Sequence, residues 1–127
     1  MYKGYNESSP EGYVAKEFDK IAPEPGFDWS GLPGSWLDQA SQGKWVVKTA
    51  ATDAKVGSII IWIDELNKAR VGIVRDISDK GIRFDTLNQS NKSLQKIATP
   101  ESLINDYKLV GYIWPERITS RMKLILH

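Results

Sequence analysis

The chain of 127 residues is long enough for one domain with a single hydrophobic core. It contains no cysteine, which excludes disulfides, thiolate metal sites and cysteine nucleophiles. Its 17 basic and 16 acidic residues give a net charge of +1, so charge gives no reason to expect nucleic acid or an anionic membrane as a partner. No apolar run approaches the roughly 20 residues that span a bilayer.

The first predicted element is a helix that begins near Pro10. Two serines precede this proline, and a hydroxyl cap followed by proline is typical of a helix start. Val14, Phe18 and Ile21 have the spacing of one buried helical face. The helix should end before Pro23, because proline cannot continue it. We expect residues 1–9 to be an extension before the domain; they lack the apolar core of a signal peptide.

The most apolar stretch, residues 58–63, is followed by the polar segment 64–69 and by a second apolar run at 71–74. Both runs are rich in β-branched residues, which predicts two strands joined by a hairpin-like connection. The first run has no polar alternation. It therefore predicts a strand near the middle of a sheet, covered on both faces.

The remaining segments complete an α+β pattern. Together they predict an antiparallel sheet of about five to six strands with an amino-terminal helix packed against it. A single domain at residues 10–116 is expected, with a tail at 117–127. The other predicted elements are a helix at residues 35–41, a short extended piece at 45–47, a half-exposed strand at 82–88, a polar mobile loop at 89–96, a short helix at 99–107 and a closing strand at 109–114.

This order of elements resembles the CHAP domain, a family of cysteine, histidine-dependent amidohydrolases and peptidases of the papain-like superfamily. The resemblance covers roughly residues 10–115 and rests on the order of motifs. These include Val-Gly before an apolar strand with Trp62, Val-Gly-Ile-Val at 71–74 and Gly-Tyr-Ile-Trp-Pro at 111–115. It implies a papain-like fold with a nucleophile at the start of the first helix and a general base on the second central strand.

The residues at the implied catalytic positions cannot carry out the family's chemistry. Val14, with Tyr13 beside it, stands where the family has its cysteine, and Arg70 stands where it has its histidine. Thr86 or Asn88 corresponds to the third polar residue of the family. Valine offers no lone pair, and a guanidinium stays charged and accepts no proton. The sequence therefore predicts no catalytic residue, only vestigial positions. If these positions form one vestigial site, the Cβ atoms of Val14 and Arg70 should be neighbours at one end of the helix–sheet junction. The single histidine, His127, is the last residue and is expected to be solvated.

A binding site without catalytic residues is the leading hypothesis. If the fold brings an aromatic ring, the Arg70 guanidinium and the segment 85–88 together, the site could hold a carboxylate or a peptide backbone. Arg70 could instead cap a strand edge or pair with Asp85 on the surface, and the tryptophans could belong to the core. The adjacent acids at 64 and 65 are interpreted as solvated. The candidate binding residues are Tyr13, Arg70, Asp85, Asn88, Trp29 and Trp36.

The expected ligand is a peptidoglycan peptide or another peptide, with a protein partner as the next possibility. The alternative hypothesis is a cell-wall amidase or endopeptidase, either altered from an active parent or using substitute residues. No metal or cofactor is predicted: histidine clusters are absent, and residues 76–79 are too short for a calcium loop. The resemblance implies a bacterial or phage protein, usually exported to the cell wall, but the residues themselves leave localisation open.

Overall fold

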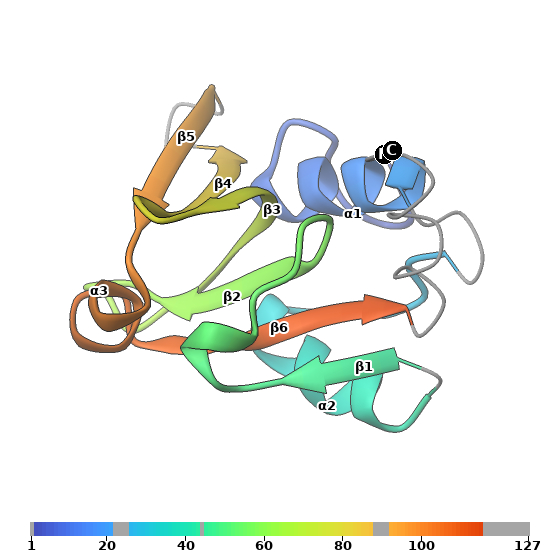
Figure 1. Cartoon of the computed structure of the whole chain (residues 1–127). Helices are drawn as coiled ribbons and strands as arrows, with labels where there is room; N and C mark the ends of the chain where they lie inside the picture. Colours follow the sequence, from blue (N-terminus) through green and yellow to red (C-terminus); the bar gives the residue numbers. More distant parts are fainter. Residues whose placement is uncertain (1, 22–25, 44, 88–91, 116–127) are drawn as a thin grey trace.

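The computed structural model describes residues 2–21, 26–43, 45–87 and 92–115 (Figure 1). Its strands form one six-stranded sheet in the order β1-β6-β2-β3-β4-β5, and every neighbouring pair is antiparallel. The predicted α+β class, with an amino-terminal helix on an antiparallel sheet, is therefore confirmed. The elements are α1 (Pro10–Ile21), η1 (Pro33–Ser35), α2 (Trp36–Ser41), β1 (Trp45–Lys48), η2 (Ala51–Asp53), β2 (Ile59–Ile63), β3 (Ala69–Ser78), β4 (Gly81–Leu87), β5 (Ser93–Ala98), α3 (Pro100–Asn105) and β6 (Leu109–Pro115).

Strand β2 lies between β6 and β3, near the middle of the sheet, as its apolar sequence predicts. Because side chains alternate along a strand, Ile59 and Ile61 face one side and Ile60 and Trp62 face the other. All four are buried. The strand therefore supplies a core on each face of the sheet.

The two cores are covered by different elements. On one face, which we call the α1 face, α1 and α2 pack against the sheet. On the other, which we call the α3 face, α3 and η2 pack against it. Figure 1 shows α1 beside β3, and α2 behind β1. Any site on one face is thus separated from the opposite face by the sheet itself.

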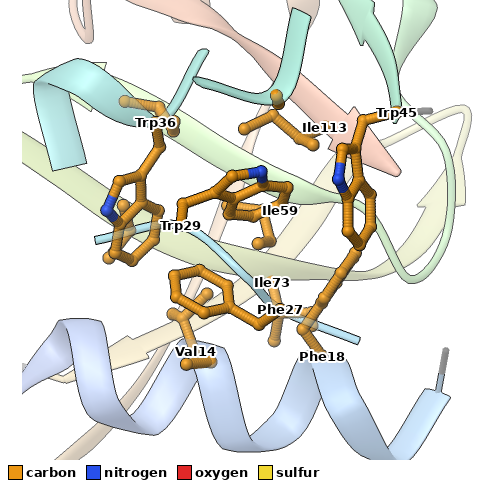
Figure 2. Close-up of a cluster of buried hydrophobic side chains, with 13 residues drawn as sticks. Val14, Phe18, Phe27, Trp29, Trp36, Trp45, Ile59, Ile73 and Ile113 are labelled. Atoms are coloured by element: carbon orange, nitrogen blue, oxygen red, sulfur yellow. The ribbon is translucent and has the colours of Figure 1, made fainter. Parts of the chain in front are cut away.

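The α1 face is filled by an aromatic cluster, shown in Figure 2. Phe27 lies edge-on to Trp29 at 4.6 Å between ring centroids and to Trp36 at 4.8 Å. Trp29 is likewise edge-on to Trp45 at 4.6 Å. Edge-to-face pairs of this kind are favoured by the ring quadrupole. Val14 of α1 belongs to the same cluster and points toward Phe27.

The segment expected to be an extension packs on the domain. Tyr2 and Tyr5 contact the α1-face core, and the Trp36 indole N–H donates to the Tyr5 hydroxyl at 3.2 Å. The Ser9 hydroxyl accepts from the Gly12 N–H at 3.1 Å, which confirms the predicted helix start. Residues 2–9 therefore belong to the folded unit.

One local prediction needs correction. The polar stretch 89–96 was expected to form a mobile loop, but Ser93–Ala98 is strand β5 and pairs with β4. Its side chains alternate between exposed and half-buried, as in an edge strand with one neighbour, so pairing with β4 outweighs its polar composition. The predicted closing strand at 109–114 is strand β6 (Leu109–Pro115), which lies between β1 and β2. The tail at 117–127 lies outside the described residues.

Candidate functional site

Val14, at the position that the resemblance assigns to the nucleophile, is a core residue. It is 0% exposed and packs with the aromatic cluster of the α1 face. Phe18, one helical turn further on, is equally buried. This part of α1 has the chemistry of a hydrophobic core and presents no group to a ligand.

Arg70, at the position of the general base, lies near the start of β3. It is directly opposite Trp62 of β2 in the antiparallel ladder. Opposed residues of a ladder point to the same side of the sheet, and Trp62 belongs to the α3-face core. Arg70 therefore projects from the α3 face.

Val14 and Arg70 lie on opposite faces of the sheet, so the structure does not bring them together. The expectation that they would be neighbours at one end of the helix–sheet junction is wrong, and with it the assignment of Val14 and Arg70 to one vestigial site. The physical reason is the two-residue period of a strand: Val71 and Ile73 of β3 face α1, which directs Arg70 away from it. A motif match along the chain does not carry this information.

Arg70 lines a groove of about 480 Å³ on the α3 face. The groove lies between the β2–β3 turn, strands β4 and β5, and the end of α3. Its lining combines charged, polar and apolar side chains. The residues are Trp62, Ile63, Asp64, Glu65, Leu66, Arg70, Thr86, Leu87, Leu94, Lys96, Asp106 and Tyr107.

Asp64 anchors Arg70 within the groove. The Arg70 Nε donates to Asp64 Oδ2 at 2.7 Å, and Asp64 Oδ1 accepts from the Leu66 and Lys68 N–H groups at 2.9 Å each. Three hydrogen bonds hold the pKa of Asp64 below its usual value despite some burial. The bond from the Lys68 N–H has the largest effect, followed by those from the Arg70 guanidinium and the Leu66 N–H. Asp64 was expected to be simply solvated, and Arg70 to pair with Asp85 if it paired at all; both expectations are corrected here.

Thr86 is the one other described residue of the implied catalytic set, and it shares the groove with Arg70. Its side chain is buried, and its hydroxyl donates to the Val71 carbonyl at 2.7 Å. The hydroxyl thus ties β4 to β3 beneath the groove. Asn88 lies outside the described residues.

Tyr13 and Asp85 lie on the α1 face, away from Arg70, in a polar cluster around Arg75. Arg75 donates through Nε to Asp85 Oδ2 at 2.9 Å and through Nη2 to Glu17 Oε1 at 2.8 Å. Burial acts to lower the pKa of Arg75, but its contacts with Tyr13, Asp85 and Glu17 outweigh burial and raise the pKa. Within the described residues, Asp85 Oδ1 is buried without a hydrogen-bond partner. The cluster links α1 to the sheet.

Trp29 and Trp36 lie in the aromatic cluster and do not line the groove (Figure 2). They are 4% and 0% exposed. Of the two uses that the sequence left open for them, the structure places both rings in the core. The six candidate binding residues therefore fall into three sets: Arg70 in the groove, the pair Tyr13 and Asp85 near Arg75, and the two core tryptophans, with Asn88 not described.

Sequence reasoning missed most of the groove. Lys96 was assigned to a loop, yet it lies with its ammonium 5.6 Å from the centroid of the Tyr107 ring. Tyr107 in turn contacts Trp62 and Phe84 edge-on. The sequence carries no clear signal for this strand, because Leu94 and Ile97, the two large apolar residues of the segment, are three positions apart and do not alternate with period two.

The described residues contain no group of three or more side chains that could hold a metal ion. No helix among them is long and apolar enough to cross a membrane.

Comparison with solved structures identifies proteins of similar fold. The crystal structure of Ly7917 aligns with a TM-score of 0.65 and 15% identity, covering 85% of this chain and 53% of that chain. The crystal structure of Ly7917 with the hydrolyzing product of MDP aligns with a TM-score of 0.67 and 15% identity, covering 87% and 55%. This chain spans about half the length of those structures. No family model and no curated protein matches the sequence. At this identity, the likeness establishes a shared fold.

Proposed function

We propose that this chain is a non-catalytic domain of the CHAP type, with a papain-like fold, that binds cell-wall peptides without cleaving them. Val14 carries the proposal: the helix position that the resemblance assigns to the nucleophile is an aliphatic residue, 0% exposed within the aromatic cluster. Acyl transfer requires an activatable lone pair next to a base. The sequence has no cysteine, and Arg70 is both permanently charged and on the other face of the sheet.

The ligand class is inferred from the solved structures of similar fold. One of them is described with the hydrolyzing product of MDP, which we take to be muramyl dipeptide, a peptidoglycan fragment. The groove around Arg70 offers a guanidinium beside aromatic and aliphatic side chains, a combination suited to a peptide.

The proposal is tested by cosedimentation of the purified chain with insoluble peptidoglycan, while turbidity is recorded in the same sample. We expect saturable binding with no loss of turbidity. Arg70→Gln should weaken the binding, because it removes the cation from the groove. Arg83→Gln is the matched control, since Arg83 is exposed on β4 and does not line the groove. Absence of binding, or equal effects of the two variants, would refute the proposal.

The competing function is a cell-wall amidase or endopeptidase that uses substitute residues. Its specific support is that a protein of similar fold is described with a hydrolysis product. The same turbidity record separates the two functions. Steady clearing by the wild-type chain, lost on substitution of a groove residue, would establish the hydrolase and exclude the binding domain.

A further inference from the structure

The charges of the groove are arranged in two zones. We define the zones by exposure: the inner zone is the half-buried charged residues, namely the cations Arg70 and Lys96 and the carboxylate Asp64. The outer zone holds two exposed carboxylates, Glu65 on the β2–β3 turn and Asp106 just after α3. These five residues come from three stretches of the chain, the β2–β3 hairpin, β5 and the end of α3, which the fold brings together.

The inner cations retain unused hydrogen-bonding capacity. Arg70 bonds Asp64 through Nε only, so its terminal guanidinium nitrogens donate to none of the described residues. Lys96 lies near the Tyr107 ring and forms no ion pair with a described carboxylate. Asp64 already accepts from Arg70 and from two backbone N–H groups, so it leaves an excess of one positive charge inside. An anionic group that enters the groove would accept hydrogen bonds from these cations.

The outer zone has the opposite preference. Glu65 forms no ion pair with a described residue, and Asp106 accepts from the Ser102 hydroxyl at 2.9 Å while remaining exposed. Neither carboxylate is neutralised by a cation within the described part of the chain. A positively charged group at the mouth of the groove would therefore be favoured.

The walls between the two zones are apolar. Trp62, Leu87, Leu94 and Tyr107 supply rings and aliphatic groups along the cavity. Its volume, about 480 Å³, is within the range of about 300–1,000 Å³ that is typical of small-molecule sites. A ligand of a few residues with an aliphatic body would fit between the inner cations and the outer acids.

We infer that this groove binds a short zwitterionic peptide, with its terminal carboxylate inside at Arg70 and Lys96 and its free amine at the rim between Glu65 and Asp106. The inference rests on the proposed function as a peptide-binding domain and specifies the ligand and the site. The site is on the α3 face, so it differs from the helix start on which the family resemblance centres.

The test uses Nα-acetyl-Lys-Ala, prepared with L- and with D-alanine, which carries one amine and one carboxylate. Three matched forms neutralise the carboxylate as an amide, the amine as an Nε-acetyl group, or both. Affinities for the intact chain are measured by calorimetry. We expect amidation to weaken binding about tenfold or more, as for loss of a charge-assisted hydrogen bond. Acetylation of the amine should cause a loss of affinity several times smaller than amidation does, because the rim is exposed.

Variants assign each effect to a zone. In Lys96→Gln, the difference between acid and amide should shrink while the effect of acetylation persists. In Glu65→Gln and Asp106→Asn, the effect of acetylation should shrink while the difference between acid and amide persists. Arg83→Gln, outside the groove, should leave all four affinities unchanged. All of these side chains are at least partly exposed, so the fold should tolerate the changes.

The outcomes distinguish this inference from the proposed function. Equal affinity for all four forms, or no affinity for any of them, overturns the zwitterion assignment, while cosedimentation with peptidoglycan reports on the domain's function independently. If the four forms rank as expected but peptidoglycan does not cosediment, the groove assignment stands and the cell-wall ligand is excluded.

Discussion

Arg70 of β3 lies directly opposite Trp62 of β2, and both side chains project from the face of the sheet that α1 does not cover. This places the guanidinium in a groove, where it is 31% exposed, and not beside Val14 in the aromatic cluster. The two positions that a catalytic pair would occupy are thus separated by the sheet, and each has a different role. Val14 is part of a hydrophobic core, and Arg70 places a positive charge in a groove.

Restoring the family's residue types should not restore catalysis. In the double variant V14C/R70H, the sulfur and the imidazole would lie on opposite faces of the sheet, so neither could activate the other. Cysteine behaves as a small hydrophobe and should be tolerated at Val14 at a cost of about 1 kcal/mol. We expect no turbidity loss from a cell-wall suspension, with thermal melts to confirm folding. Clearing by the double variant but not by either single variant would mean that the strand register is different.

The start of α1 should be intolerant of any side chain at Gly12. A Cβ at this position would lie 2.1 Å from the Asn6 carbonyl oxygen, so Gly12→Ala must push residues 5–7 off the helix. We expect a loss of about 1–3 kcal/mol in the free energy of unfolding, measured by urea denaturation. Gly34→Ala is the control, because the nearest atom to its Cβ, on Ala69, is at an ordinary 3.6 Å. Equal stability of the two variants would show that residues 5–7 do not pack as described.

The buried hydroxyl of Tyr112 should contribute measurably to stability. It donates to the Ala51 carbonyl at 2.9 Å, so Tyr112→Phe leaves a buried acceptor without its partner. We expect a loss of about 1–2 kcal/mol in the free energy of unfolding. A change below about 0.5 kcal/mol would indicate that water replaces the hydroxyl.

The same tyrosine predicts the behaviour at high pH. Burial, followed by the charge of Asp53, raises the pKa of Tyr112 to about 12 from its ordinary value of 10.0. Because the folded state holds this proton more tightly than the unfolded state, the stabilisation is complete below about pH 10 and is lost as pH rises toward about 12. Because the hydrogen bond to Asp19 also raises the pKa of Tyr2 to about 12, ultraviolet titration should show late-ionising tyrosines in wild type and one fewer in Tyr112→Phe. Normal ionisation of every tyrosine would contradict this.

Glu17 should make the fold sensitive to acid. Burial opposes its charge, but hydrogen bonds from Lys20 and Arg75 outweigh burial and lower the pKa of Glu17 from 4.5. A lowered carboxyl pKa contributes stability above the unfolded value, and that stability is lost as pH falls through the folded value. Denaturation midpoints measured across this range should fall less steeply for Glu17→Gln than for wild type. An unchanged slope would show that the Arg75 cluster contributes nothing to acid stability.

The elements of local origin could be predicted from the sequence. The start of α1 follows from its serine cap, and the start of α3 follows from Thr99-Pro100. The central position of β2 follows from its apolar run. Each of these signals acts within a few residues. Strand β5 was missed because its segment is polar and becomes a strand only by pairing with β4.

The groove could not be predicted for a related reason. Arg70 was singled out, but its face depends on strand register, which the motif does not encode. Lys96 and Asp106 reach the same cavity through β5 and the end of α3, and only the folded arrangement brings them near Arg70. Trp29 and Trp36 had two possible environments, and their burial depends on how residues 26–36 fold back over α1.

The most direct test of binding without cleavage is mass spectrometry of soluble peptidoglycan fragments recovered from the chain after prolonged incubation. The account predicts that wild type retains fragments of unchanged mass and that Arg70→Gln retains far less. Recovery of fragments that have gained a water across an amide bond, dependent on the chain and absent from the buffer control, would contradict it.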